Sequence, residues 1–273
     1  MPEGDTVYRL ARRLDEALAG RVVARSDLRV PRHATADLSG ATVVGTATHG
    51  KHLLTRLRPP SGDPLTLHTH LRMDGSWTVL RPGRRLPRHL EPDVRVRLDL
   101  EGGGSAVGLK LPVVELLLTR DEDGAVGHLG PDPLRADWDA EEAIRRLRLE
   151  PGRTFVVAFL DQTLMAGLGN LWVNEVAFLR GVWPWTPVGD VDVAAAVRLA
   201  ARMLRFSATH PRAVQVTTGD LRPGRQHWVA GRAGQSCLRC GTTIQVRAEV
   251  TGDPEQRRTW WCPSCQPEPA RIP

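Results

Sequence analysis

The sequence has few lysines, no cysteine before residue 237 and no apolar run long enough to cross a bilayer. Its first residues contain no basic segment followed by an apolar one, so no signal peptide is predicted and we expect a cytoplasmic protein. No internal repeat is visible, which argues against a solenoid. The length of 273 residues leaves room for two domains, each with its own core.

The cysteines all lie within the last forty residues. In a cytoplasmic protein such clustering indicates a metal site and not a set of disulfides. Two Cys-x-x-Cys pairs about twenty residues apart are typical of a zinc site on two turns of a β-hairpin. Four cysteine ligands leave no open coordination position, so the predicted zinc is structural, and a ribbon of this size folds only with its metal. The predicted ligands are Cys237, Cys240, Cys262 and Cys265.

The charge balance is basic, with 37 Lys+Arg against 31 Asp+Glu and a formal net charge of +6. This suits a polyanionic partner, although a basic surface without a special partner is also common. Nearly all of the positive charge is arginine, whose planar fork matches phosphate. Lys51 and Lys110 are the only lysines, which favours a particular need for an ammonium group in His49-Gly50-Lys51-His52. There Lys51 could hold a phosphate; the alternative is a solvated surface lysine.

The N-terminal part combines one helix with many short strands. Apolar residues at helical spacing predict a helix over residues 5–19, with Asp5 as its N-cap and Gly20 just beyond its end. From Arg21 to Arg120, short apolar or alternating runs separated by Gly, Pro and Asp predict a sandwich or barrel. The predicted strands include Val22–Val23, Ala41–Thr46, His52–Leu57, Leu65–His70, Ser76–Leu80, Val94–Leu98, Ala106–Leu111 and Val113–Thr119.

The C-terminal part is predicted to be mainly helical. Residues 121–136 are rich in Asp, Gly and Pro and predict a linker. After Asp139 the apolar period becomes helical, whereas Thr243–Val246 and Arg258–Trp261 can supply the two strands of the zinc ribbon. The predicted helices are Ala140–Leu149, Arg153–Leu164, Asn170–Arg180 and Val191–Ser207.

The segment Met1-Pro2-Glu3 allows two interpretations. Removal of an initiator Met before a small residue would leave Pro2 with a free secondary amine. An α-amino group titrates near pH 8 (about 7.7–8.0), so part of it is nucleophilic at neutral pH and can form a Schiff base. Glu3 is adjacent as a proton donor or acceptor, and the dipole of the following helix favours the neutral amine. The alternative is a frayed terminus.

Two further segments indicate contact with nucleic acid. Two glycines in Ala166–Asn170 permit close approach of the backbone to a phosphate, and Asn170 would begin the next helix. The alternative is an ordinary turn between helices. Met73, in a predicted turn after Leu65–His70, could insert into a base stack or could instead fold back on the core.

Together these segments resemble the formamidopyrimidine-DNA glycosylase / endonuclease VIII family of DNA-repair glycosylases, most of all an endonuclease VIII subgroup. The resemblance covers nearly the whole chain. It rests on the order and spacing of the segments more than on any one of them. The matching segments are Met1–Asp5, Gly50–His52, His70–Gly75, Leu129–Leu134, Leu160–Gln162, Ala166–Asn170, Gly231–Gly234 and Gln256–Gln266.

The resemblance implies an α+β multidomain fold: an N-terminal helix plus β-sandwich, a helix-two-turn-helix domain and a C-terminal zinc-finger β-hairpin. It divides the chain into a catalytic domain at 1–125, a linker at 126–136, a helical DNA-binding domain at 137–222, a zinc finger at 223–266 and a tail at 267–273. It also implies a nucleoid-associated monomer that binds double-stranded damaged DNA, has no membrane partner and holds one structural Zn²⁺ per chain.

The resemblance further implies a bifunctional DNA glycosylase and lyase of base excision repair. Pro2 would attack C1′ of the flipped nucleotide, Glu3 would move protons at the sugar, and the Schiff base would allow β,δ-elimination. Lys51 would serve at the same catalytic site by gripping a phosphate.

The family's remaining DNA contacts map onto three positions. Asn170 and Arg257 match phosphate-gripping positions, and Met73 matches a position that fills the void in the duplex. Arg257 is preferred to Arg258 because it lies five residues before the third cysteine, where the family's finger arginine falls.

The sequence departs from the 8-oxoguanine branch of the family. Gly108–Val113 contains no Arg-x-Phe loop, and Asp5-Thr6 is similar to an endonuclease VIII subgroup, so oxidised pyrimidines are the expected substrates. One alternative is a non-catalytic zinc-containing DNA damage-binding protein, which would need neither Pro2-Glu3 nor Lys51. Another is an unrelated N-terminal-proline enzyme such as a tautomerase, which would not explain the zinc ribbon.

Overall fold

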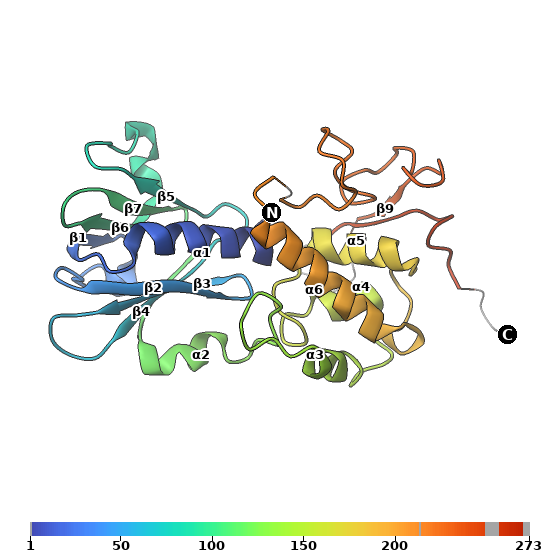
Figure 1. Ribbon diagram of the computed structural model, residues 1–273, viewed down its shortest axis with the longest axis horizontal. Coiled ribbons are helices and arrows are strands. Elements are labelled where there is room, and N and C mark those ends of the chain that lie inside the picture. The colour runs from blue at the N-terminus through green and yellow to red at the C-terminus, as the bar shows by residue number, and fades with distance from the viewer. Residues whose placement is uncertain (1, 213, 249–256, 270–273) are drawn as a thin grey trace. The chain divides into compact units, whose positions relative to one another are not determined.

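The computed structural model describes residues 2–212, 214–248 and 257–269. The chain divides into two compact units, Met1–His128 and Leu129–Pro273, traced from blue to red in Figure 1. The division falls within the segment 126–136 that was predicted as the linker. Part of the predicted tail, residues 270–273, lies outside the described residues. Among the helices described, none has the length and apolar character that a bilayer crossing requires.

Two four-stranded antiparallel sheets and one long helix form the first unit (Figure 1). The sheets have the strand orders β1-β6-β7-β5 and β2-β3-β4-β8. Their bounds agree closely with the predicted strands, because turn residues separate each run from the next. The strands are β1 (Val23–Leu28), β2 (Thr42–His49), β3 (His52–Arg58), β4 (Leu65–His70), β5 (Ser76–Leu80), β6 (Val94–Leu100), β7 (Ser105–Leu109) and β8 (Val113–Leu118).

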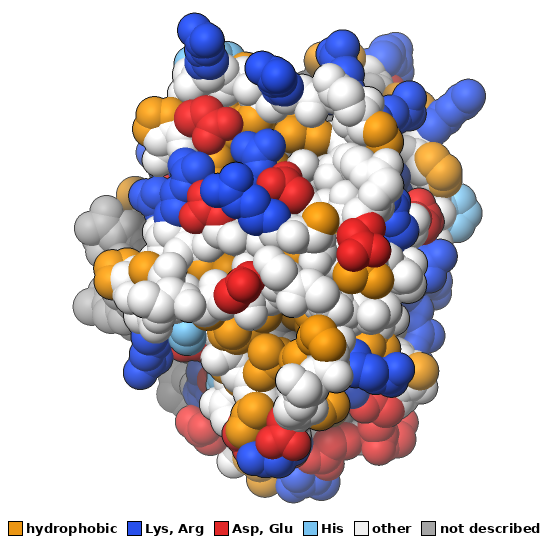
Figure 2. Space-filling view, turned by 90° about the vertical axis from the view of Figure 1, so that its left-hand side faces the viewer, with side chains coloured by type: hydrophobic (Ala, Val, Ile, Leu, Met, Phe, Trp, Pro, Cys, Tyr) orange, Lys and Arg blue, Asp and Glu red, His pale blue; other side chains and the backbone are white. Residues whose placement is uncertain are grey.

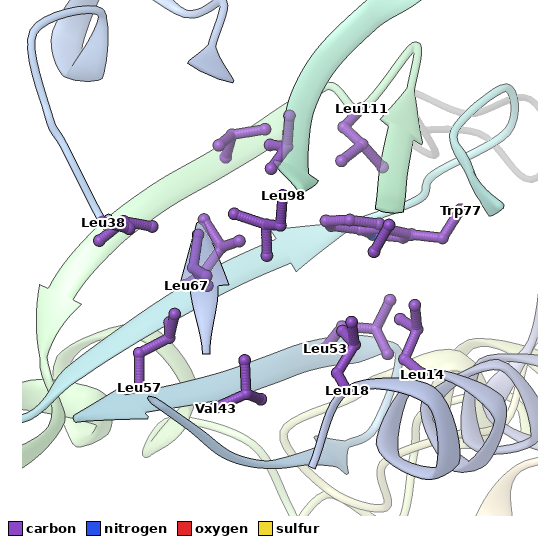
Figure 3. Packing of buried hydrophobic residues seen from close by; sticks show 14 of the residues in the cluster. Leu14, Leu18, Leu38, Val43, Leu53, Leu57, Leu67, Trp77, Leu98 and Leu111 are labelled. Carbon is purple, nitrogen blue, oxygen red and sulfur yellow. The ribbon is translucent and has the colours of Figure 1, made fainter. Parts of the chain in front are cut away.

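The core of this unit lies between the two sheets and under the helix (Figure 3). Leu14 and Leu18 come from the helix, Leu53 and Leu57 from β3, and Leu98 from the opposite sheet. Each of these side chains is 1% exposed or less. Their burial confirms the predicted β-sandwich and fixes the ends of the strands relative to the helix.

Helix α1 (Gly4–Leu18) begins slightly before the predicted position. The predicted N-cap, Asp5, is wrong: Glu3 is the N-cap and forms a capping box with Thr6. Thr6 Oγ1 accepts from the Glu3 backbone N–H at 2.8 Å and donates to the Glu3 carbonyl at 2.8 Å. Asp5 lies buried in the first turn, where a negative charge favours the helix dipole. Gly20, with φ of 77°, follows the helix end as predicted.

The segment 121–136 is not a continuous linker, because α2 (Glu122–Val126) forms within it. Arg56 on β3 donates two hydrogen bonds to the Glu122 carboxylate, at 2.7 and 2.6 Å. Thr66 on β4 donates a third at 2.5 Å. These partners are more than fifty residues away in sequence, so local composition could not predict the helix.

Helices and a small hairpin form the second unit (Figure 1). Phe155, Phe159 and Trp172 are completely or almost completely buried in its main core. Strands β9 (Gln245–Arg247) and β10 (Thr259–Trp261) pair antiparallel, as expected for the zinc ribbon. Four helices lie at the predicted positions, although α4 is shorter than the predicted Arg153–Leu164: α3 (Ala140–Leu147), α4 (Phe155–Leu160), α5 (Asn170–Arg180) and α6 (Val193–Thr209).

Surface charge on the first unit is mixed. Figure 2 shows the side at the left of Figure 1, where Lys and Arg side chains stand among Asp and Glu side chains and do not gather in one basic patch. Arg29 is 2.8 Å from Asp27, and Arg97 is 3.0 Å from Asp99. Such pairs neutralise much of the arginine, so a net charge of +6 does not by itself locate a polyanion site.

Candidate active site and metal centre

The start of α1 holds the predicted catalytic pair. Glu3 is 1% exposed, whereas Pro2 is half-buried. The capping box with Thr6 fixes the Glu3 backbone, so this carboxylate belongs to an ordered structure and not to a frayed end. A buried carboxylate beside the first residues of a chain is an unusual arrangement unless it has a chemical role.

The register of α1 against β2 brings Lys51 to the same end of the unit as Glu3. The Thr46 backbone N–H donates to Asp15 Oδ1 at 2.8 Å. From Asp15 back to Glu3 the helix covers about 18 Å, and from Thr46 on to Lys51 the strand covers about 17 Å. The start of α1 and the β2–β3 turn therefore reach the same end, as Figure 1 also shows.

Lys51 lies in a two-residue hairpin turn. His49 and His52 are the closing pair, and Gly50 has φ of 56° at the first central position. That conformation favours glycine and gives the tight hairpin that keeps Lys51 at the tip. The sequence His49-Gly50-Lys51-His52 thus presents one ammonium group at the end of two strands.

Met73 lies in the turn that follows β4 and is 60% exposed. The Gly75 backbone N–H donates to the Leu71 carbonyl at 2.9 Å, and a Cβ at Gly75 would approach that oxygen to 2.6 Å. Because His70 pairs with His52, this turn is also at the Lys51 end of the unit. Met73 does not fold back on the core.

In the second unit, Asn170 is joined to the segment that carries Arg257. The Asn170 side chain donates to the Arg258 carbonyl at 2.8 Å. One turn later on α5, Asn174 accepts from the Trp260 backbone N–H at 2.8 Å. The N-terminus of α5 is thereby fixed beside the hairpin strand that follows Arg257, which is itself half-buried.

The glycine turn before α5 is held by Gln162. Its side chain donates to the carbonyls of Leu160 and Leu168 at 2.9 and 2.8 Å, and accepts from the Gly167 N–H at 3.0 Å. The Gly130 N–H donates to the Gln162 carbonyl at 2.8 Å, so the segment 129–134 packs against this turn. The two motifs that stood apart in the sequence are one structural unit.

The four cysteines form a candidate metal centre. Their Sγ atoms all lie within 4.8 Å of one another. A tetrahedral zinc with Zn–S bonds of about 2.3 Å would place the sulfurs about 3.8 Å apart, so the set fits that ion. Of the described residues, only these are grouped as metal ligands: Cys237, Cys240, Cys262 and Cys265.

Two polar clusters were missed by sequence reasoning. Glu175 on α5 is fully buried and accepts from the backbone N–H groups of Trp228, Val229 and Ala230, each at 2.8 Å, and from Thr217. This carboxylate holds the segment before the cysteine centre onto α5. The other cluster consists of histidines on β3 and β4, and the spacing of His68 and His70 on one strand was the available signal.

The β7–β8 connection consists of residues 110–112 only. Lys110 has φ of 48°, its backbone N–H donates to the Asp93 carbonyl at 2.8 Å, and its ammonium is 3.5 Å from the Asp93 carboxylate. Leu111 is buried. No long loop extends from this connection.

Comparisons with known proteins agree with this architecture. The model of the formamidopyrimidine-DNA glycosylase N-terminal domain matches residues 1–109. A probable endonuclease 8 2 of Streptomyces coelicolor is 50% identical, with 100% of this chain and 96% of the relative covered. The DNA-(apurinic or apyrimidinic site) lyase Nei2 of Mycolicibacterium smegmatis is 42% identical, with 97% and 99% covered.

A solved structure extends the likeness to the fold. The Lactococcus lactis Fpg protein, in complex with DNA that contains an abasic site, matches with a TM-score of 0.79 and 24% identity, over 98% of this chain and 100% of that one. The predicted resemblance, fold class and enzyme class are thereby confirmed. This chain belongs to the formamidopyrimidine-DNA glycosylase / endonuclease VIII family of DNA-repair enzymes.

Proposed function

We propose that this chain removes damaged bases from double-stranded DNA and then cleaves the abasic site, with Pro2 as nucleophile after removal of Met1. The burial of Glu3 in the N-cap of α1, directly after Pro2, carries the proposal. The position of Lys51 at the same end of the unit supports it. The relatives named endonuclease 8 and DNA-(apurinic or apyrimidinic site) lyase support the reaction class. We further propose that the protein acts as a monomer in the cytoplasm, on nucleoid DNA.

In the proposed reaction, the Pro2 nitrogen forms a bond to C1′ and the bond from C1′ to the base breaks. The base leaves with that electron pair and gains a proton. Opening of the sugar gives a Schiff base, which withdraws electrons from C2′ and makes its proton acidic. Loss of that proton allows the 3′ phosphate to leave, and a second elimination releases the 5′ phosphate. Glu3 moves protons at the sugar during base release and ring opening.

Each unit supplies proposed phosphate contacts. In the first, Lys51 supplies a point charge. In the second, the Asn170 amide has two N–H donors, of which one already serves Arg258, and Arg257 supplies a bidentate fork. The exposed Met73 side chain enters the gap left by the flipped nucleotide. Zinc is the proposed metal at the four cysteines, where it would hold the hairpin that carries Arg257.

We propose oxidised pyrimidines as the preferred lesions, because the short β7–β8 connection ties Lys110 to Asp93 and carries no Arg-x-Phe loop. Single-turnover excision from duplexes with dihydrouracil or thymine glycol is expected to be at least about tenfold faster than from 8-oxoguanine opposite cytosine. That factor corresponds to about 1.4 kcal/mol of barrier. Equal or faster excision of 8-oxoguanine would contradict the preference.

Few variants are needed to identify the nucleophile, because the sequence contains only three primary or terminal amino groups: the terminal one, Lys51 and Lys110. Borohydride reduction should trap a covalent adduct with abasic-site duplex DNA. A Lys51→Arg/Lys110→Arg variant keeps both positive charges but only the terminal amine, and it should still be trapped. If it binds this DNA as tightly as the wild type and gives no adduct, a lysine is the nucleophile. A non-catalytic damage-binding protein would bind without any trapping.

A further inference from the structure

A groove on the second unit contains none of the residues assigned to the proposed reaction. Helices α3 and α6 pack against each other in this unit, and an open groove of about 300 Å³ lies between the start of α3 and the outer face of α6. This feature is called the α3–α6 groove below. The residues that line it are Trp138, Ala140, Arg198, Ala201, Arg202 and Arg205.

The inner part of the α3–α6 groove is apolar. Ala201 on α6 is 6% exposed, whereas Trp138 is half-buried and packs against the main core of the unit. Ala140, the first residue of α3, is also half-buried. Because alanine has a short side chain, an indole ring beside two methyl groups leaves a hollow that an aliphatic or phenyl side chain can fill. Filling it would remove apolar surface from water, which is favourable.

The edge of the groove is formed by a row of arginines on α6. Arg198, Arg202 and Arg205 are all exposed, and their spacing of four and then three residues places them on one face of the helix. The row covers about 10 Å along the helix axis. Arg205 Nε donates to the Pro133 carbonyl at 2.6 Å, which orients a guanidinium that carries further N–H donors.

The positive charge of this row is not balanced inside the groove. No carboxylate lines it, and Arg198 and Arg202 form no ion pair with any carboxylate in the described part of the chain. At the start of α3, Glu142 already binds Arg145 and Arg146, each with a nitrogen–oxygen distance of 2.7 Å. Like charges at this helical spacing repel one another. A partner that brings carboxylates to the row would therefore be bound favourably.

We propose that the α3–α6 groove docks an acidic segment of a partner protein, with an aliphatic or phenyl side chain of that segment in the hollow beside Trp138. Arginine clusters bind acidic motifs through charge-assisted hydrogen bonds. Carboxylates two residues apart on an extended chain, or one turn apart on a helix, are separated by about 5–7 Å, which matches the spacing of Arg198 and Arg202. A nucleic acid backbone would engage the arginines but has no short apolar branch for the hollow. The proposal does not depend on the proposed lyase chemistry.

The test measures binding of a fluorescent peptide to the whole chain by anisotropy. The peptide has one central Leu between runs of Asp and Glu, and excess unlabelled abasic-site duplex DNA occupies the proposed DNA contacts. Arg198→Ala/Arg202→Ala should weaken peptide binding about tenfold, because two contacts to carboxylates are lost. Alanine favours a helix, so α6 should remain folded. Replacement of the peptide Leu by Ser should also weaken binding about tenfold, because the hollow is left unfilled.

Arg145→Ala/Arg148→Ala is the matched control, because it removes the same charge from two exposed arginines outside the groove. It should change peptide binding by less than about twofold. Equal weakening by the two double variants would reveal a general charge effect and would overturn the proposal. So would the absence of saturable binding to the wild type, or displacement of the peptide by the duplex. Tighter binding of a single-stranded oligonucleotide that depends on Arg198 and Arg202 would overturn the choice of a protein partner.

A measurement on the wild-type protein covers the case in which an arginine variant does not fold. Nitrogen–proton NMR reports each tryptophan indole separately, and Trp138→Phe identifies the Trp138 signal by its loss. This signal should shift as the acidic peptide is added, whereas the signal of Trp172, which is 1% exposed in the main core, should not. Saturable peptide binding without a shift at Trp138 would place the peptide elsewhere and contradict the proposal.

Discussion

The two ends of the chain are stabilised in different ways. The first unit has a broad apolar core in which residues such as Leu53, Leu57 and Leu98 are completely buried between two sheets. The C-terminal hairpin has strands of three residues, and every residue of β9 is exposed. Only a small apolar cluster that includes Phe178, Val229 and Ile244 packs there, and hydrogen bonds between α5 side chains and the hairpin backbone add to it, together with the cysteine centre. Hydrophobic periodicity therefore predicts the first region, whereas ligand spacing predicts the second.

The proposed covalent chemistry and the proposed phosphate contact of Arg257 belong to these two different regions. The proposed nucleophile and Glu3 lie directly before α1, whose apolar face is part of the large core. Arg257 stands beside a hairpin that α5 holds through Asn170 and Asn174. We therefore expect the first arrangement to tolerate loss of the metal and the second not to.

Loss of the metal should have the largest effect and should be confined to the second unit. Chelation or Cys262→Ser is expected to unfold the hairpin, because structural zinc contributes about 10–16 kcal/mol of binding free energy in small ribbons. DNA affinity should fall more than about tenfold. Elemental analysis should find one zinc per chain in the wild type. A Cys262→Ser protein with a folded hairpin and unchanged affinity would contradict the structural role.

Leu53→Ala is the reciprocal control. Removal of this buried side chain from β3 should lower the free energy of unfolding of the first unit by about 2–5 kcal/mol. Zinc content should remain at one per chain, because no cysteine lies in that unit. Joint loss of zinc and of the sandwich in either variant would show that the two regions are not independent.

Arg257→Ala should have a smaller and purely electrostatic effect. Loss of one phosphate contact should reduce the slope of log affinity against log salt by about 0.9. Arg258→Ala is the matched control, because Arg258 is joined to α5 through its backbone carbonyl, which the substitution leaves in place. The assignment fails if the two variants change the salt slope equally, or if only Arg258→Ala changes it.

Much of the fold was predictable because local pattern and tertiary burial agree. The stripe that includes Leu14 and Leu18 predicted α1, and the short run His52–Leu57 between turn residues predicted β3. The N-cap was mispredicted because Asp5 has the usual residue type, whereas the capping box with Thr6 begins at Glu3. Helix α2 was missed because Glu122 is held by partners distant in sequence.

The candidate site was predictable only in part. The cysteine spacing predicted the metal centre, and the resemblance supplied Pro2, Glu3 and Lys51. Two sets of contacts were not predictable, because each depends on pairing between elements that no local pattern specifies. One is the hydrogen bond from Asn170 to the Arg258 carbonyl. The other is the pair of hydrogen bonds that His68 forms with Glu115 and His52. Those contacts emerge only from strand register and from the fold of α5 against the hairpin.

The central claim is that the terminal amine of Pro2 performs the covalent step. The most direct measurement is mass spectrometry of the borohydride-trapped wild type after digestion. The account predicts a deoxyribose remnant on the N-terminal peptide, at the nitrogen of Pro2, in a chain that lacks Met1. A remnant on the peptide of Lys51 or Lys110, or a trapped chain that still carries Met1, would contradict it.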